Sequence, residues 1–223
     1  MLEIKDLTVA FDQIKILQDL NLIIKESTLT CLIAPNGSGK TTLFRTITNQ
    51  LKKEKGVITI DDHGSHDRLF FNQNLFFMED TQRLTENFSA IENLELIKIL
   101  WNSSVDIDEV VQLLKMESFQ HKKVKKMSLG MRQKVLIACA VISDARILIF
   151  DEPLNGLDIK NMGLINKVFT KLKGQEKAVL LSSHNIHELL KISDDVYFLH
   201  EGKIVTVPNN LEIINQQYSQ LFG

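Results

Sequence analysis

Hydrophobic and polar residues alternate near the start of the chain in the pattern of β-strands. Side chains along a strand point to opposite faces in turn, so an apolar residue at every second position marks a half-buried strand. Residues 1–24 show two such runs, and residues 57–60 (Val-Ile-Thr-Ile) give another short strand. Residues 29–34 are largely apolar, which indicates a central strand covered on both faces.

Farther along the chain, apolar residues recur at helical spacing between about Glu86 and Met116. The second half then returns to alternating elements. It predicts helix 132–142, strand 147–150, helix 161–172, strand 178–182, helix 187–192 and a strand pair at 196–199 and 203–207. This alternation favours an α/β core with a mainly parallel sheet, interrupted by a helical insert.

Composition narrows the class of protein. The 223 residues are 44% hydrophobic, enough for one substantial core, and the net charge of −2 gives no general case for nucleic-acid binding. Cys31 and Cys139 lie in apolar runs, which suits buried thiols in a reducing compartment. The N-terminus is unlike a signal peptide, and the longest apolar run, 135–142, is shorter than the roughly 20 residues that cross a bilayer. Any membrane role therefore requires a partner.

A glycine-rich loop follows the apolar strand at 29–34 and leads into a predicted helix. Its backbone N–H groups can wrap a phosphate, and the helix directs its positive end at the same anion. Lys40 can reach the outer phosphates, and the Thr41 hydroxyl can ligate Mg²⁺. The first position departs from the phosphate-loop pattern, because Ala34 replaces a glycine and gives up access to positive φ. The residues expected to bind a nucleoside triphosphate are Ala34, Pro35, Asn36, Gly37, Ser38, Gly39, Lys40, Thr41 and Thr42.

Two further segments can complete a nucleotide site. Asp151 ends the strand at 147–150, where it can hold Mg²⁺, and Glu152 can polarise a water for attack on a phosphate. Ser128 and Gly130 begin a helix, where small residues favour an anion. Each segment alone could be structural, as a strand capped by acids or a capped helix. Together with the phosphate loop they indicate nucleotide hydrolysis.

The ordered set of motifs resembles the ATP-binding cassette (ABC) ATPases over nearly the whole chain. Its members are Phe11, the loop at 34–42, the helical insert, Ser128-Leu129-Gly130-Met131, the carboxylates, Asn155-Gly156-Leu157-Asp158 and His184. The sequence contains no Asn-Lys-x-Asp motif for reading guanine, and this absence counts against a GTPase. The resemblance implies an α/β P-loop NTPase fold with a mainly parallel core sheet and an N-terminal antiparallel β subdomain. It also implies one ABC domain over residues 1–223, with a helical subdomain inserted at about 85–140.

The same resemblance implies roles for side chains around ATP and Mg²⁺. Phe11 stacks on adenine, unless it is a core aromatic, and Thr42 binds the α-phosphate. Thr41 and Asp151 serve Mg²⁺.

Hydrolysis and dimer formation are assigned in the same way. Glu152 is the general base, and His184 holds the attacking water, with a helix-capping histidine as the alternative. Ser128 and Gly130 face the phosphate loop of a second chain, and Asp158 lies at the dimer seam. ATP is therefore sandwiched in a dimer, of identical or different chains, that closes on ATP and reopens after hydrolysis.

Two departures from the family pattern matter. The family signature Leu-Ser-Gly-Gly-Gln appears as Met-Ser-Leu-Gly-Met at 127–131, a variant that resembles exporter ATPases for bacteriocins, lantibiotics and peptide antibiotics. No glutamine obviously precedes the helical insert. Glu79, after the strand at 75–78, is the expected Mg²⁺ ligand in its place, with Gln73 and Gln82 as rivals and a solvated acidic loop as a further alternative.

The implied protein is the ATP-hydrolysing subunit of an ABC transporter that exports a peptide, antibiotic or similar compound. It would lie in the cytoplasm on the inner face of the membrane, docked on a separate permease subunit, with no nucleic acid expected. The alternatives are an importer ATPase and a soluble ABC protein of translation or DNA repair. The apolar residues Phe76, Phe77, Leu84 and Phe88 fit either the core or a groove for the membrane partner.

Overall fold

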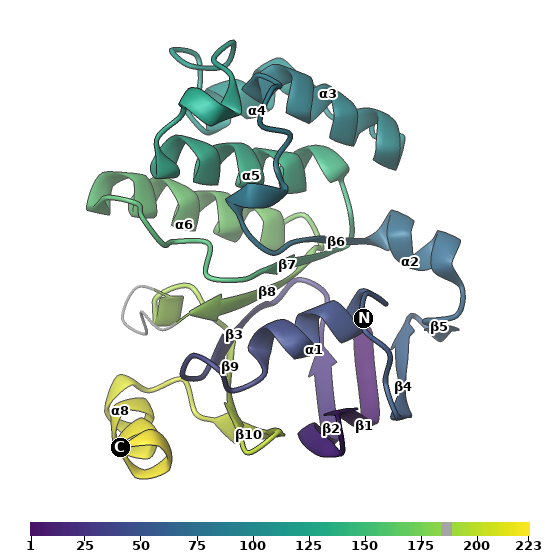
Figure 1. The fold of residues 1–223 in the computed structure, drawn as a ribbon. Helices are drawn as coiled ribbons and strands as arrows, with labels where there is room; N and C mark the ends of the chain where they lie inside the picture. Colours follow the sequence, from purple (N-terminus) through teal and green to yellow (C-terminus); the bar gives the residue numbers. More distant parts are fainter. Residues whose placement is uncertain (184–188) are drawn as a thin grey trace.

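The strands of the protein form two sheets, as shown by a computed structural model that describes residues 1–183 and 189–223 (Figure 1). The smaller sheet is antiparallel with the order β2-β1-β4-β5, and β1 pairs with both β2 and β4. Its strands are β1 (Leu2–Phe11), β2 (Ile14–Ile24), β4 (Lys55–Ile60) and β5 (His63–Gly64). The expected N-terminal antiparallel sheet is thus present.

The larger sheet has the order β10-β9-β3-β8-β7-β6. All its neighbouring strands pair in parallel except β9 and β10, which form the antiparallel pair expected at the end of the sequence. Its strands are β3 (Leu29–Ile33), β6 (Leu75–Met78), β7 (Ile147–Phe150), β8 (Ala178–Ser183), β9 (Asp195–His200) and β10 (Lys203–Val207). The mainly parallel core sheet is confirmed.

Both faces of the larger sheet are covered. Cys31 and Ile33 of β3 join a core that includes residues of α3, α5 and α6, whereas Leu32 joins a second core with α1 and the antiparallel sheet. Figure 1 shows this layering, with α5 and α6 on one side of β7 and β8 and α1 on the other. This double burial explains why β3, β7 and β8 are nearly continuous apolar runs in the sequence.

Helices connect and cover the sheets. The chain segment between β6 and β7 contains α3, α4 and α5, where the sequence predicts the helical insert. Ser89 caps α3 through a reciprocal bond with Glu92, and Ser128 caps α5. The helices are α1 (Lys40–Ile47), α2 (Arg68–Asn74), α3 (Ala90–Trp101), α4 (Ile107–Leu113), α5 (Leu129–Ser143), α6 (Ile159–Lys173) and α8 (Leu211–Phe222), with short 3₁₀ turns at Thr81–Arg83 and Val124–Lys126.

Two helices were not anticipated from the sequence. Helix α2 leads into β6, and α8 places Tyr218 and Phe222 against Phe198 of β9, with ring centroids 6.1 and 5.7 Å away. The helix expected at 187–192 lies partly outside the described residues, and of the remainder residues 189–190 are helical.

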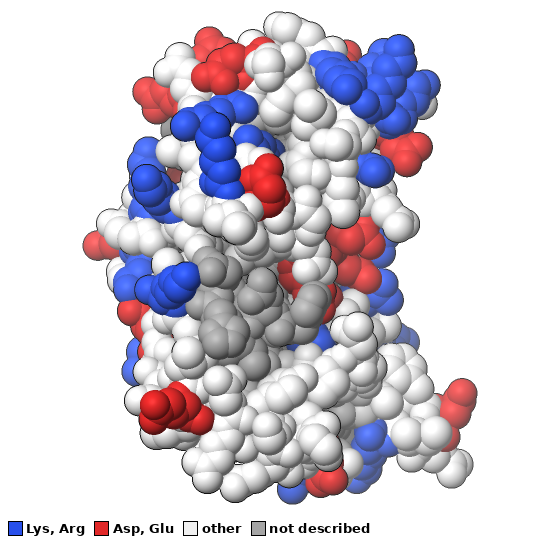
Figure 2. All heavy atoms as spheres, turned by 90° about the vertical axis from the view of Figure 1, so that its left-hand side faces the viewer, with Lys and Arg blue, Asp and Glu red and all other residues white. Residues whose placement is uncertain are grey.

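Charges of both signs are interspersed on the face shown in Figure 2, with a denser group of Lys and Arg at the helical end of the molecule. The opposite end of this face is mostly uncharged in this view. Within the part of the chain that the structure describes, no helix combines the length and the apolar character needed to cross a membrane.

Candidate functional site

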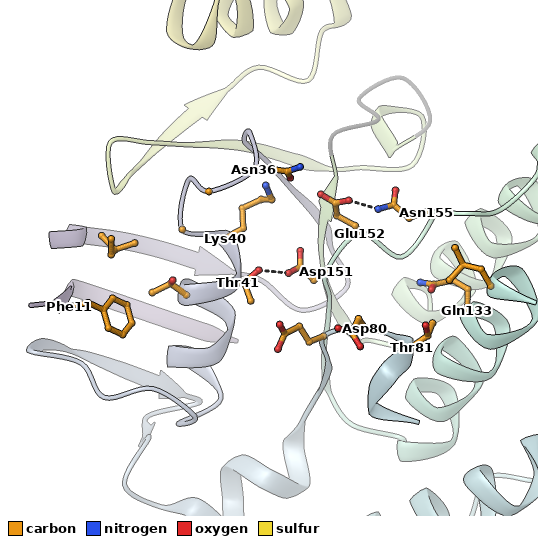
Figure 3. Close-up of a pocket in the computed structure, with 16 residues that line it drawn as sticks. Phe11, Asn36, Lys40, Thr41, Asp80, Thr81, Gln133, Asp151, Glu152 and Asn155 are labelled. Atoms are coloured by element: carbon orange, nitrogen blue, oxygen red, sulfur yellow. Dashed lines mark hydrogen bonds between the residues drawn. The ribbon is translucent and has the colours of Figure 1, made fainter. Parts of the chain in front are cut away.

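The carboxyl ends of the parallel strands bring the predicted site residues together. Ile33 of β3 pairs with Ser183 of β8, while Phe150 of β7 pairs with Leu181 of β8 and with Met78 of β6. The segments that follow β3, β7 and β6 therefore leave the sheet side by side, where ligands bind in open α/β sheets. They line a pocket of about 650 Å³ together with Phe11 and α5 (Figure 3).

The backbone conformation of the loop at 34–42 requires glycine at two positions, 37 and 39. Gly37 and Gly39 have φ of 81° and 103°, and a Cβ on Gly39 would lie 2.9 Å from Cγ2 of Ile16. Ala34 is not among the residues with positive φ, and its side chain is buried. The departure from glycine at this position therefore imposes no backbone strain.

Two polar side chains of the loop, Ser38 and Lys40, can donate hydrogen bonds to an anion. The Ser38 hydroxyl oxygen is buried and, among the described residues, has no hydrogen-bond partner. The Lys40 ammonium donates to the carbonyl oxygens of Ala34 (2.7 Å) and Pro35 (2.9 Å). Burial lowers the pKa of Lys40, and the nearby carboxylates of Glu152 and Asp151 oppose that shift. These donors fit a phosphate group.

The predicted Mg²⁺ residues from the two halves of the chain meet directly. The Thr41 hydroxyl donates to Oδ2 of Asp151 at 2.7 Å, although 110 residues separate them (Figure 3). The Ser182 hydroxyl of β8 donates to the other Asp151 oxygen and accepts the backbone N–H of Glu152 at 2.9 Å. A hydroxyl beside a carboxylate is a donor set that suits Mg²⁺.

Glu152 follows in a sharp turn. Its φ of 52° lies in the left-handed region, and its carboxylate accepts a hydrogen bond from the side-chain amide of Asn155. Figure 3 shows Glu152 between Lys40 and Asn155, and all three residues line the pocket. His184, the other residue expected to act in hydrolysis, lies outside the described residues.

Glu79 lines the pocket, but its carboxylate is occupied by arginines. Arg45 of α1 donates to both oxygens, at 2.8 and 2.6 Å, and Arg83 reaches one of them at 3.3 Å. The Arg45 guanidinium holds the pKa of Glu79 below its usual range. Its rivals Gln73 and Gln82 are exposed and do not line the pocket.

Ser128 and Gly130 of the signature segment lie outside this pocket. Ser128 and Gly130 line a separate hollow of about 530 Å³ with Lys134 and Asp158. Leu129, which lies between Ser128 and Gly130 in the chain, lines both this hollow and the larger pocket. Within one chain, the phosphate loop and the Ser128 hydroxyl therefore belong to different surfaces.

Three contacts in the pocket were not anticipated from the sequence. Ser182 bridges Asp151 and Glu152, Asn155 holds the Glu152 carboxylate, and Arg45 binds Glu79. Ser182 could have been found from the sequence, because it lies at the end of an otherwise apolar strand. A polar group in a buried strand costs free energy unless it has a hydrogen-bond partner. Arg45 carries no such signal, since its partner Glu79 is 34 residues away and is set by the fold. Asn155 and Glu152 are three residues apart, and the turn between them brings their side chains together.

Comparison with known proteins finds ATP-binding proteins of transporters among the relatives of this chain. Residues 17–155 match the family model described as ABC transporter. The ABC transporter ATP-binding protein NatA of Bacillus subtilis is 31% identical over 200 residues, which cover 86% of this chain and 81% of NatA. The lantibiotic transport ATP-binding protein SrtF of Streptococcus pyogenes is 29% identical over 206 residues, which cover 92% of this chain and 89% of SrtF.

Solved structures share the fold. The structure of an ATP-binding subunit of an ABC transporter aligns over 100% of this chain and 95% of its own, with a TM-score of 0.87 and 23% identity. The dimeric structure of MJ0796, a bacterial ABC transporter cassette, aligns over 92% of this chain and 96% of its own, with a TM-score of 0.80 and 26% identity.

Proposed function

Because the chain belongs to the ATP-binding subunits of the ABC transporter family, a family that binds ATP, we propose that it hydrolyses ATP with Mg²⁺ to drive export. The observation that carries this proposal is the contact between Thr41 of the phosphate loop and Asp151 of β7. It places a loop built for phosphates beside a carboxylate suited to a metal.

The phosphate loop would hold the triphosphate. The backbone N–H groups of residues 36–41, the orphan Ser38 hydroxyl and the Lys40 ammonium would bind its oxygens, with Thr42 at the α-phosphate. Phe11, at the pocket edge, would stack on the base.

Thr41 and Asp151 would hold Mg²⁺, and Ser182 would keep Asp151 in place. Mg²⁺ neutralises negative charge on phosphate oxygens when bound. Glu79 would join the ion only after its carboxylate leaves Arg45, which now occupies both oxygens. Glu152 would accept a proton from the attacking water, and His184 would hold that water.

A second cassette would complete the site. Ser128 and Gly130 face a hollow apart from the phosphate loop of their own chain, so a partner would have to supply these groups to the bound nucleotide. The dimeric structure of the related cassette MJ0796 supports this arrangement. The partner would be a second copy or a related chain, and ATP would act as the closing ligand.

Export is the direction that we propose. It rests on the Ser-Leu-Gly-Met signature variant at 128–131, and one relative, SrtF, is described as a lantibiotic transport ATP-binding protein. The cargo would be a peptide, antibiotic or similar compound. An importer ATPase remains the second candidate, and a gene for a solute-binding protein beside this one would favour it.

The membrane subunit would dock in a groove of about 330 Å³ beside α2 and α3. Phe71, Phe77 and Leu100 line it, and the indole N–H of Trp101 is buried there, with no hydrogen-bond partner among the described residues. Leu100 is 64% exposed, which is high for an apolar residue. A short helical segment on the cytoplasmic side of the permease would cover these side chains. Phe76 and Leu84, in contrast, are buried in the core.

Replacing the general base tests the proposal. Glu152→Gln should retain ATP binding with Mg²⁺ but lower hydrolysis by about 100-fold or more, because the amide cannot accept the proton. The trapped ATP complex should elute as a dimer. Phosphate release, nucleotide binding and light scattering measure the three properties.

Glu95→Gln, an equivalent change at an exposed position of α3, is the matched control and should hydrolyse ATP normally. Normal turnover by Glu152→Gln would remove Glu152 from the mechanism. Failure of the wild-type chain to bind ATP with Mg²⁺ would overturn the proposed function as a whole.

A further inference from the structure

The turn after β7 ties Glu152 to Asn155. The Asn155 side-chain amide donates to Oε2 of Glu152, and the Asn155 backbone N–H donates to the Glu152 carbonyl oxygen at 3.2 Å. Figure 3 shows the two side chains facing each other across the first of these bonds. Asn155 thus holds one oxygen of the Glu152 carboxylate.

The next residue, Gly156, is pressed against the start of α5. A Cβ on Gly156 would lie 2.3 Å from Cδ2 and 2.8 Å from Cγ of Leu129. A Cβ added to Gly130 would lie 3.5 Å from the Gly156 carbonyl oxygen, so the backbones of the two segments run close to each other. Gly156 also has a φ of 75°, which a glycine adopts without strain.

These contacts form one path of touching groups. It runs from Leu129 at the first turn of α5 to Gly156, then through the peptide bond to Asn155 and by its amide to Glu152. Leu129 is 46% exposed, so hydrophobic burial explains its presence at this position poorly. The family signature has a glycine at the position of Leu129, and a glycine there would have no side chain to contact Gly156.

We propose that Asn155 is a positioning residue for Glu152, and that Leu129 holds Asn155 in place through Gly156. This inference rests on the proposed function, in which Glu152 takes the proton from water.

The first test removes the amide of Asn155. Asn155→Ala and Asn155→Leu, which keeps the size of the side chain but cannot donate, should each lower kcat about tenfold or more, since small displacements of a reacting group have large effects on rate. The KM and Kd for ATP should stay within about twofold, because in this proposal the Asn155 amide acts on Glu152 and not on the nucleotide. Asn87→Ala, which removes an exposed amide bonded to Lys125, is the matched control.

The second test asks whether Leu129 acts through Asn155. Leu129→Ala should lower kcat by itself, and in the Asn155→Ala background it should have little further effect, because the path is already broken. Leu211→Ala, at a similarly exposed leucine of α8, should leave kcat unchanged. All variants should melt near the wild-type temperature.

An unchanged kcat in Asn155→Ala or Asn155→Leu would overturn the positioning role. Reductions that multiply in the double variant would overturn the path through Gly156. Either result leaves ATP hydrolysis by the wild-type chain intact, whereas a wild-type chain without hydrolysis refutes the proposed function first.

Discussion

Single side chains of the pocket are already held by neighbouring groups of the protein. Lys40 is bound by two loop carbonyls, Thr41 by Asp151, and Glu152 by Asn155. Groups fixed in advance need little reorganisation when a charged ligand binds, which is the basis of electrostatic preorganisation. At the residue scale, the protein itself therefore holds the side chains of this pocket in place.

Phe11 offers a prediction at this scale. Its ring is 45% exposed and lines the pocket, so Phe11→Ala should weaken ATP binding about tenfold, as loss of base stacking does, with little change in melting temperature. Phe11→Trp, which keeps an aromatic ring at this position, should bind ATP about as tightly as the wild type. Titration with a fluorescent ATP analogue measures both.

Phe88→Ala is the matched control, because Phe88 is 38% exposed and does not line the pocket. Unchanged affinity in Phe11→Ala would exclude stacking and leave Phe11 as an ordinary aromatic at the end of a strand.

At the scale of elements, the nucleotide pocket depends on how α1 is joined to β6. Arg45, in the last turn of α1, binds Glu79 directly after β6, and Glu79 is only 16% exposed. The pair ties the helix that follows the phosphate loop to the segment beside Asp151. Its two-pronged geometry makes it stronger than a typical surface pair.

Removing this link has a pH-dependent consequence. Arg45→Met should destabilise the chain by about 1 kcal/mol at pH 7, or about 2–4 °C in melting temperature for a domain of this size. The folded-state pKa of Glu79 is lowered, so the contribution is present above the unfolded value of about 4.3 and is lost as the pH falls through the folded value. The melting temperatures should therefore converge in acid.

Arg83→Met is the comparison, because Arg83 is 56% exposed and reaches Glu79 at 3.3 Å; its effect should be smaller. A difference between Arg45→Met and wild type that persists unchanged at the lowest pH at which both fold would contradict an electrostatic origin.

At the scale of the whole molecule, the proposed functions lie on different surfaces. The phosphate loop opens on one pocket, the signature residues Ser128 and Gly130 on another, and the apolar groove beside α3 on a third. Such a distribution suits a subunit that meets nucleotide, a second cassette and a membrane protein at once.

The groove gives a prediction for the assembled transporter. Leu100→Asp should reduce co-purification with the proposed permease subunit by about tenfold, because a carboxylate would be buried against apolar side chains. ATP hydrolysis by the isolated chain should be unchanged, since Leu100 does not line the nucleotide pocket.

Leu211→Asp is the control for charge on an exposed leucine, and an acidic residue is tolerated at the start of α8. Full co-purification of Leu100→Asp would show that the permease binds elsewhere.

Much of the fold and site was predictable from the sequence. Apolar runs fixed β3, β7 and β8, and the loop at 34–42, Asp151 and Glu152 stand at strand ends as expected, because strand period and turn residues are local signals. Helix α8 was missed, although Asn210 caps it and Ile214, Tyr218 and Phe222 follow at four-residue spacing. The extent of the helical subdomain, about 85–140, stays a prediction.

The sequence by itself determined the family and the local chemistry, because the phosphate loop and the carboxylates are encoded by short, contiguous patterns. Only the tertiary structure decided which distant groups meet. The order of the parallel strands joins Thr41 to Asp151, directs Arg45 to Glu79, presses Leu129 on Gly156, and keeps Ser128 apart from its own phosphate loop. These pairs are long-range contacts, and spacing along the chain carries no information about them until the sheet has formed.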